Sequence, residues 1–353
     1  MEIYVLDRDI NILGIFSTYN SILWNPRFHE PGIFKAEFVF SQKMDKILKL
    51  GNLLYKTDEQ EAGIITRKIL TLNGNGEEVM QIQGYMASRY LNQRIVWDKM
   101  IITGTVEQVM REMVYEQAIA PKKPERIIPN VELGSLQGYG ESIAKQITYD
   151  NLQEALTELS KESGLGYTLR LNINERKFFF EVYKGADRTR NSEIPCVFTR
   201  DYGNIYAQEY SEDNTNYRNV CLIGGRGEDS DRIMATVGAE NVGLDRYEMF
   251  YNASVPNDKD ITEAEYMKQL QQKGAEKLAS YYIARAFESK INQNKITTCN
   301  LGDYVSCIDK TWNIMVDTQI KEIEKCFSKT EQSLVMTFGD NVPTLVQLIK
   351  AKE

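Results

Sequence analysis

Apolar residues change their spacing twice along this chain. Near both ends they recur at about every second position, as in 3–6, 33–40 and 314–323, which is the pattern of half-buried strands. From about residue 99 the spacing becomes that of amphipathic helices, and after Pro195 the strand pattern returns. The pattern therefore predicts an α+β fold that is mainly antiparallel β, with an α/β segment inserted between two strand-rich ends.

The first strand-rich part contains one loop, one short helix and one well-defined hairpin. Trp24-Asn-Pro-Arg-Phe-His-Glu-Pro-Gly32 has two prolines and a glycine, so we expect an irregular loop around His29. A short helix should begin after Ser41 and end before Gly51. Strands 63–72 and 78–85 flank Asn73-Gly-Asn-Gly76, which predicts a hairpin because Asn and Gly tolerate positive φ.

Three helices are expected further on. Thr105 and Gln108 form a capping box for a helix over about 104–118, whose apolar stripe is Val106, Val109, Met110, Met113 and Val114. A second helix should span 151–163 and end at Gly164, followed by a hairpin of 167–171 with 178–183. Thr262 and Glu265 predict the start of a third helix, over about 262–285. We therefore divide the chain into 1–98 (β), 99–198 (α/β insertion) and 199–353 (β, with a helical insertion around 240–290).

Charge and histidine content restrict the function. With 42 basic and 50 acidic residues the net charge is −8, which disfavours tight binding to duplex nucleic acid. His29 is the only histidine, so zinc sites with several histidines within one chain are excluded. Any Ser-His or Cys-His catalysis would have to use His29, and no nucleophile motif lies near it. We expect His29 to serve loop packing or a subunit contact.

The five cysteines are expected to be reduced core thiols of a protein made in a cytosol. Their number is odd and no two stand at C-x-x-C spacing, so neither a disulfide scaffold nor a zinc ribbon is expected. The N-terminus lacks the features of a signal peptide, and no apolar segment approaches the ~20 residues that span a bilayer. The cysteines are Cys196, Cys221, Cys299, Cys307 and Cys326.

No catalytic, cofactor-binding or metal-ligating residue is assigned. Gly224-Gly-Arg-Gly227 lacks the residues of a phosphate loop and is interpreted as a turn, and Glu228-Asp-Ser-Asp231 lacks the spacing of a calcium loop. Two alternatives stay open: paired carboxylates among the 50 acids of a cell-wall hydrolase, and aromatic platforms of a carbohydrate- or receptor-binding β module. For the 20 Tyr and 13 Phe, a sheet core or an interface is the simpler interpretation.

A series of short strings follows a fixed order over nearly the whole chain: Ile3-Tyr-Val-Leu-Asp-Arg-Asp9, Leu13-Gly-Ile15, Trp24 to Pro31-Gly32, Phe34-x-x-Glu37-Phe38, Gly63-Ile-Ile65, Gly84-x-x-x-x-Arg89, Arg94-Ile-Val96, Ile127-Ile-Pro-Asn130, Gly164-Leu-Gly-Tyr167, Phe180-Glu-Val-Tyr-Lys-Gly185-x-Asp187-Arg188, Asn216-Tyr-x-Asn219-Val220, Gly243-Leu-Asp-Arg246, Tyr266 to Gly274, Leu301-Gly-Asp303 and Phe338-Gly339. In this order they resemble the siphophage and prophage tail proteins related to the central baseplate hub of contractile phages.

The resemblance implies a structural tail-tip or baseplate hub and no enzyme. It implies two β-barrel-like hub domains with α/β insertions, and a homotrimeric ring that continues the tail tube in the virion or a tail-like particle made in the bacterial host cytoplasm. Expected partners are the distal tail protein, the tape measure protein and receptor-binding or lytic tail components, with DNA passing through unbound. Because the chain ends soon after Phe338-Gly339, no C-terminal extension with peptidase or receptor-binding activity is expected.

Most of the charge deficit lies in one segment. Residues 199–260 hold six basic and 12 acidic residues, which accounts for −6 of the net −8. Carboxylates would repel DNA in transit, so one hypothesis is that Glu228, Asp229 and Asp231 face the lumen of the ring. The alternative is a solvated outer loop kept acidic for solubility.

Overall fold

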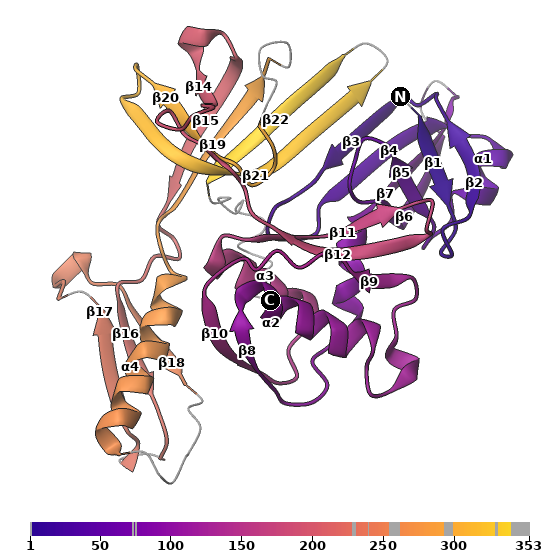
Figure 1. Ribbon diagram of the computed structural model, residues 1–353. Coiled ribbons are helices and arrows are strands. Elements are labelled where there is room, and N and C mark those ends of the chain that lie inside the picture. The colour runs from indigo at the N-terminus through magenta and orange to yellow at the C-terminus, as the bar shows by residue number, and fades with distance from the viewer. Residues whose placement is uncertain are drawn as a thin grey trace. The chain divides into compact units, whose positions relative to one another are not determined.

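The computed structural model describes residues 2–72, 74, 76–227, 231–238, 240–253, 262–292, 299–328 and 331–339. The chain forms two compact units (Figure 1). Unit 1 combines Met1–Glu209 with Phe287–Gly339, and unit 2 contains Tyr210–Ala286. The two strand-rich ends of the sequence therefore meet in one unit. The predicted domain boundaries at 98/99 and 198/199 stay a prediction.

A 14-stranded, mainly antiparallel sheet joins both ends of the chain, in the order β15-β19-β22-β21-β3-β4-β7-β6-β5-β1-β2, with β13 and β14 paired to β20 and β20 to β21. Within the described strands this path runs open from β15 to β2, so the β-barrel-like domains that the resemblance implies stay a prediction. The strands are β1 (Ile3–Leu6), β2 (Ile12–Phe16), β3 (Ser21–Asn25), β4 (Ile33–Val39), β5 (Leu53–Lys56), β6 (Gly63–Leu72), β7 (Glu78–Met86), β13 (Asp187–Arg188), β14 (Val197–Thr199), β15 (Ile205–Asp213), β19 (Ala284–Ile291), β20 (Tyr304–Asp309), β21 (Ile314–Ser328) and β22 (Gln332–Gly339).

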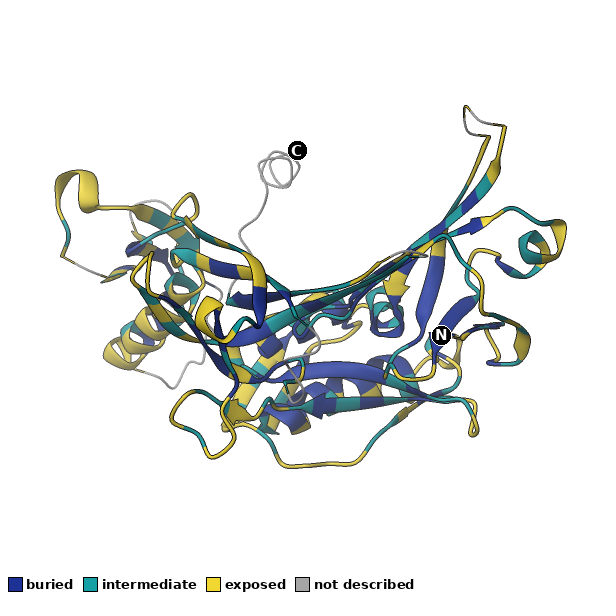
Figure 2. Ribbon diagram, turned by 90° about the horizontal axis from the view of Figure 1, so that it is seen from above, coloured by how far each residue is buried: buried dark blue, intermediate teal, exposed yellow. Residues whose placement is uncertain are grey.

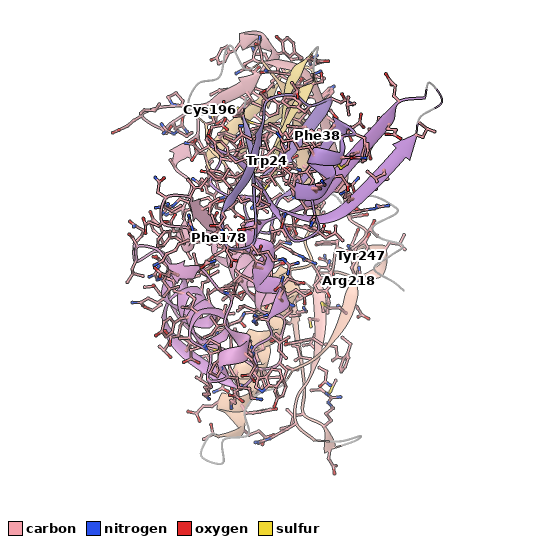
Figure 3. All side chains as sticks on the ribbon, turned by 90° about the vertical axis from the view of Figure 1, so that its right-hand side faces the viewer. Trp24, Phe38, Phe178, Cys196, Arg218 and Tyr247 are labelled. Atoms are coloured by element: carbon pink, nitrogen blue, oxygen red, sulfur yellow. A yellow bond between two sulfur atoms is a disulfide. The ribbon has the colours of Figure 1, made fainter. Side chains whose placement is uncertain are left out.

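The long strand β21 connects the two ends. Its first part pairs with β20, and its last part pairs with β22 on one side and with β3 on the other, where Lys325 faces Trp24 and Ser328 faces Ser21. Trp24 and Phe38 belong to the core beneath this part of the sheet and are fully covered by neighbouring side chains (Figure 3). The alternation predicted for these strands is present along β4, where every second residue is buried. Figure 2 shows how buried and exposed residues are distributed over the fold.

The local predictions for the N-terminal part are confirmed. Strands β6 and β7 form the hairpin, with Leu72 opposite Glu78, although residues 73 and 75 of its turn lie outside the described residues. Helix α1 (Gln42–Ile47) begins at the Ser41 cap and ends before Gly51. Gly84 on β7 is required by close packing, because a Cβ there would overlap the carbonyl oxygen of Ile64.

The α/β segment forms the lower part of unit 1 in Figure 1. Helix α2 (Val106–Val114) begins with the predicted capping box, and helix α3 (Leu152–Ser163) ends at Gly164 with φ 68°. They pack with a two-stranded sheet, a three-stranded sheet and the underside of β1 and β5 in one core. The remaining elements are β8 (Met100–Thr105), β10 (Ser142–Ile147), β9 (Val131–Leu133), β11 (Gly166–Asn172), β12 (Lys177–Tyr183), the π-helix η2 (Tyr115–Ile119) and the 3-10 helices η1 (Ala87–Gln93), η3 (Pro124–Arg126) and η4 (Arg200–Tyr202).

Unit 2 is a small sheet covered by one helix. Its strands are β17 (Met234–Gly238), β16 (Val220–Gly224) and β18 (Glu248–Asn252), in that order, with the 3-10 helix η6 (Gly243–Asp245) before β18. Helix α4 (Glu263–Ala279) lies along them (Figure 1) and begins with the predicted capping box. The expectation that this helix continues to 285 is wrong. It ends at Ser280 because the Tyr281 carbonyl accepts from the Arg218 N–H and residues 284–291 join the main sheet as β19.

The expectation that all five cysteines are reduced is also wrong. Cys196 and Cys299 form a disulfide in unit 1, with a Cα–Cα distance of 6.6 Å and a sequence separation of 103 residues. Cys221 and Cys307 are free and buried, and Cys326 is free and half-buried. Residue spacing along the chain did not predict the disulfide because its two cysteines are brought together only by the packing around β14 and β20.

Candidate functional site

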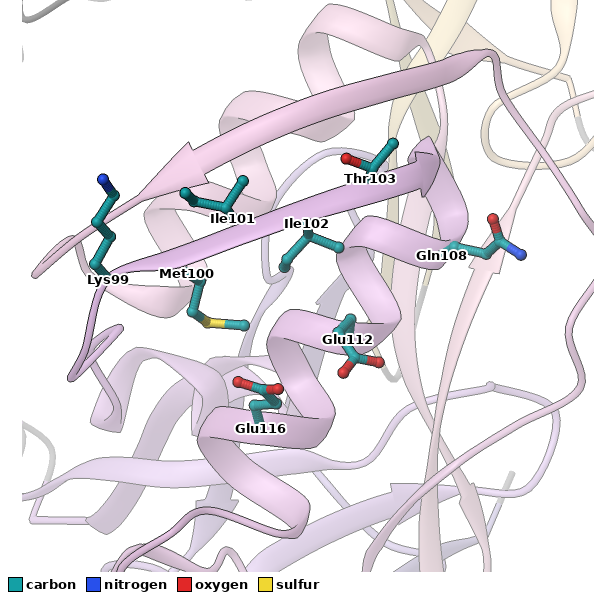
Figure 4. A pocket seen from close by; sticks show the side chains of 8 residues that line it. All are labelled: Lys99, Met100, Ile101, Ile102, Thr103, Gln108, Glu112 and Glu116. Atoms are coloured by element: carbon teal, nitrogen blue, oxygen red, sulfur yellow. The ribbon is translucent and has the colours of Figure 1, made fainter. Parts of the chain in front are cut away.

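A groove of about 610 Å³ lies in unit 1, between strand β8 and helix α2 (Figure 4). Its lining comes from three groups of side chains: the strand, the start of the helix, and two glutamates further along the helix. These residues are Lys99, Met100, Ile101, Ile102, Thr103, Gln108, Glu112 and Glu116. The sequence analysis assigned no site here, although Glu112 and Glu116 stand four residues apart on the polar face of the predicted helix.

One edge of β8 opens into this groove. Strand β8 pairs with β10 alone among the described strands. The Val106 N–H donates to the Glu141 carbonyl, so in this antiparallel register Gly104, Ile102 and Met100 make the hydrogen bonds to β10. The N–H and C=O groups of Ile101 and Thr103 therefore point to the opposite edge. The same edge ends at Thr105, whose N–H donates to Gln108 Oε1 in the capping box.

Two carboxylates form the helix side of the groove. Glu112 and Glu116 are both exposed and stand at i and i+4, which places their Cβ atoms about 5–6 Å apart. Desolvation, the Glu112 charge and a hydrogen bond with Glu112 all raise the pKa of Glu116, while Lys122 acts in the opposite direction. The groove thus carries a concentrated negative charge that a cationic group would stabilise.

These glutamates do not have the arrangement of a glycosidase pair. A hydrolase that cleaves glycosides needs two carboxyl groups about 5–10 Å apart on opposite sides of the substrate. Here both side chains lie on one wall of the groove, on the same helix (Figure 4). The groove between β8 and α2 therefore does not support the alternative of a cell-wall hydrolase with paired carboxylates.

His29 is buried in a cluster that joins three distant parts of unit 1. Its Nδ1 lies 2.7 Å from Ser160 Oγ on α3, and its Nε2 lies 2.5 Å from Lys321 Nζ on β21. The side chain is 7% exposed, and Ser160 is fully buried. Phe28 beside it makes an edge contact with Tyr183. The prediction of a packing role for His29 is in accord with this burial.

The directions of the hydrogen bonds argue against an activated serine. A Lys321 ammonium group has only donor hydrogens, so it donates to Nε2 and leaves the imidazole proton on Nδ1. That proton is donated to Ser160 Oγ, whose own hydroxyl donates to the Leu165 carbonyl at 2.5 Å. In a Ser-His nucleophile the hydroxyl donates to the imidazole instead. Burial, then the Lys321 and Lys161 charges, lower the pKa of His29 to about 3, so the ring is neutral near pH 7.

Other buried carboxylates anchor the backbone. Glu107 on α2 accepts from the N–H groups of Gln137 and Tyr139 at 2.8–3.1 Å. Asp303 accepts from the N–H groups of Ala186 and Asn300, each at 2.8 Å. The oxygen atoms of these carboxylates thus already accept hydrogen bonds from the backbone. The sequence analysis did not identify either residue, because the burial of an acidic side chain depends on tertiary contacts.

Only part of the acidic 228–231 segment belongs to the described residues. Asp231 is exposed, whereas Glu228 and Asp229 lie outside the described residues. No group of three or more His, Cys, Asp or Glu side chains with the arrangement of a metal site occurs among the residues that the structure places. Within the same residues, no helix combines the length and apolarity needed to cross a membrane.

The fold is shared with prophage tail proteins. The 43 kDa tail protein of prophage MuSo2 from Shewanella oneidensis has 13% sequence identity and a TM-score of 0.60, covering 96% of this chain and 98% of that chain. A tail protein from Neisseria meningitidis MC58 gives 13% and 0.60, with 96% of each chain covered. Prophage tail protein gp18 from Listeria monocytogenes EGD-e gives 14% and 0.54, with 100% of both chains covered. A comparison with curated proteins gave no match.

At 13–14% identity, structural similarity establishes only that the fold is shared. A match to a sequence family relates this chain more closely to other proteins. The family model described as Siphovirus ReqiPepy6 Gp37-like protein matches residues 2–340. The resemblance to phage and prophage tail proteins drawn from the sequence is thereby confirmed. Because the match extends over nearly the whole chain, this protein belongs to the Siphovirus ReqiPepy6 Gp37-like family.

Proposed function

We propose that this protein is a structural hub of a phage or prophage tail tip. Three copies would form a ring that continues the tail tube, with 1–98 and 199–353 acting as two β-barrel-like hub domains and 99–198 as the α/β insertion. The observation that carries the proposal is a fold shared with prophage tail proteins over 96–100% of both chains, together with membership of a siphovirus family. The proposal assigns no catalytic residue.

The edges of the main sheet support self-association. Strand β2 is one end of the sheet, and its residues Ile12, Leu13 and Ile15 are each at least 40% exposed. Tyr206 on β15, at the other end, is 68% exposed. Open strand edges with apolar side chains are unfavourable in an isolated soluble protein, and closure into a ring would cover them.

The proposed neighbours are the distal tail protein, the tape measure protein and receptor-binding or lytic tail components. DNA would pass through the ring without specific binding. The acidic 199–260 stretch, with Asp231 exposed at its surface, supports either a lumen that repels DNA or a solvated outer loop. A structure of the trimer that shows the position of Asp231 decides between the two.

The proposal is tested by light scattering on the purified full chain and by imaging of labelled tails. We expect a trimer at high concentration and three-fold density at the distal end of the tail. Ile12→Lys with Ile15→Lys should prevent trimer formation, whereas Leu136→Lys, which charges an apolar position in the α/β segment, should not. A stable dimer combined with tails that lack three-fold density would overturn the hub assignment.

A further inference from the structure

We propose that the groove between β8 and α2 binds an extended segment of a partner protein, which joins the β10–β8 sheet as a third strand. The segment carries basic side chains on one face and apolar side chains on the other. This inference concerns a surface of the α/β segment and does not depend on the ring proposed above. It rests on three features of the groove: the open backbone edge, the exposed faces of β8 and the two glutamates.

The open edge supplies the main-chain recognition. Ile101 and Thr103 present two N–H and two C=O groups toward the groove, and no hydrogen bond from these four groups to another described residue occurs. Unpaired strand edges accept added strands through such groups. Because the Thr105 N–H is already used by Gln108, pairing ends there. The site therefore fits a short strand opposite residues 99–103.

The faces of β8 determine where the side chains of the added strand would lie. Met100 is buried and Ile102 packs against the core, so both point to the side of α2 (Figure 4). Ile101, which is 66% exposed, is on the other face. Side chains of an added strand alternate in the same way. One set would contact Ile101, which favours apolar residues, and the other set would lie over α2.

The glutamates determine the chemistry of that second set. Glu112 and Glu116 form the helix side of the groove, and their mutual repulsion contributes to the raised pKa of Glu116. A lysine or arginine placed between them would relieve this repulsion, whereas an acidic residue would add to it. Lys99 immediately precedes β8, and the Lys122 charge lowers the pKa of Glu116. The negative charge of the groove is therefore confined to α2.

The test uses the full chain and the probe acetyl-Thr-Lys-Val-Lys-Val-Thr-amide at low salt. On isotope-labelled protein, saturating peptide should slow hydrogen exchange at the Ile101 and Thr103 amides. Exchange at Ile102 should not change, because that residue already pairs with Lys145. The peptide with Glu in place of both Lys should bind at least 5-fold more weakly. Methylation of the amides on one set of alternate peptide residues should abolish binding, while methylation of the other set should not.

Protein variants separate charge from folding. Glu112→Gln with Glu116→Gln should weaken binding of the lysine peptide about 5-fold or more, since each exposed ion pair contributes modestly. Glu154→Gln with Glu158→Gln makes the same charge change at the same spacing on α3, outside the groove, and should leave affinity unchanged.

Three outcomes would overturn the inference. In the first, millimolar peptide leaves exchange at Ile101 and Thr103 unchanged. In the second, the acidic and basic peptides bind equally well. In the third, these amides become protected as protein concentration rises without peptide, which would mean that a second copy of this chain occupies the edge. None of these outcomes bears on trimer formation through β2, so failure here is distinguishable from failure of the hub proposal.

Discussion

At the scale of single residues, His29 makes the stability of unit 1 depend on pH. Its pKa is about 3 in the folded protein and near 6.5 when unfolded, so the unfolded chain binds the extra proton between these values. The contribution of neutral His29 to the stability of unit 1 is therefore fully present above about pH 6.5. It is lost progressively as the pH falls toward 3. Between pH 6.5 and 4.5 the protonation of this one group should lower the unfolding free energy by about 2–3 kcal/mol.

The measurement is denaturant unfolding followed by tryptophan fluorescence, which reports on unit 1 because Trp24, Trp97 and Trp312 all lie in it. His29→Gln keeps an acceptor for Lys321 but does not titrate in this range. The unfolding free energy of this variant should be lower than that of the parent protein at pH 7. It should also decrease less steeply than that of the parent as the pH falls. Parallel pH profiles for the two proteins would show that His29 is not the titrating group.

At the scale of elements, Glu107 attaches the 134–141 segment to helix α2. The carboxylate is fully buried and accepts from two backbone N–H groups. Glu107→Gln replaces one acceptor oxygen by an amino group that faces those donors. We expect a loss of about 2 kcal/mol in the unfolding free energy, as for a buried hydrogen bond to a charged group.

The matched control is Glu112→Gln on the same helix, where the side chain is exposed. That variant should stay within about 0.5 kcal/mol of the parent in the same unfolding experiment. Equal effects of the two substitutions would mean that the backbone contacts of Glu107 contribute nothing beyond its charge.

At the scale of the whole molecule, the Cys196–Cys299 disulfide closes a loop that contains Tyr210–Ala286 of unit 2. Cross-linking positions this far apart restricts the unfolded chain, and removing such a bond typically costs about 2–4 kcal/mol. We expect Cys196→Ser with Cys299→Ser to lower the melting temperature of unit 1. The variant Cys326→Ser, which alters a free thiol, should have a much smaller effect.

Thiol titration of the denatured, unreduced protein provides a direct check. Three of the five cysteines should react before reduction and all five after it. Five reactive thiols at the outset would show that the bond does not form in solution, and the reduced state expected from the sequence would then hold.

The amino-acid sequence determined the features that depend on near neighbours. The capping boxes at Thr105 and Thr262, the left-handed Gly164 and the hairpin of β6 with β7 each follow from residues a few positions apart. The ordered strings along the chain were also sufficient to recognise the family, because family membership is a property of sequence order.

Tertiary structure alone decided what depends on residues far apart. The end of α4 at Ser280, the pairing of Cys196 with Cys299 and the burial of His29 against Ser160 and Lys321 all result from long-range contacts. The groove shows the same limit, since the helix that carries Glu112 and Glu116 was predicted but the open edge of β8 beside it was not. Hydrophobic periodicity reports which face of an element is buried, and it contains no information about which other element covers that face.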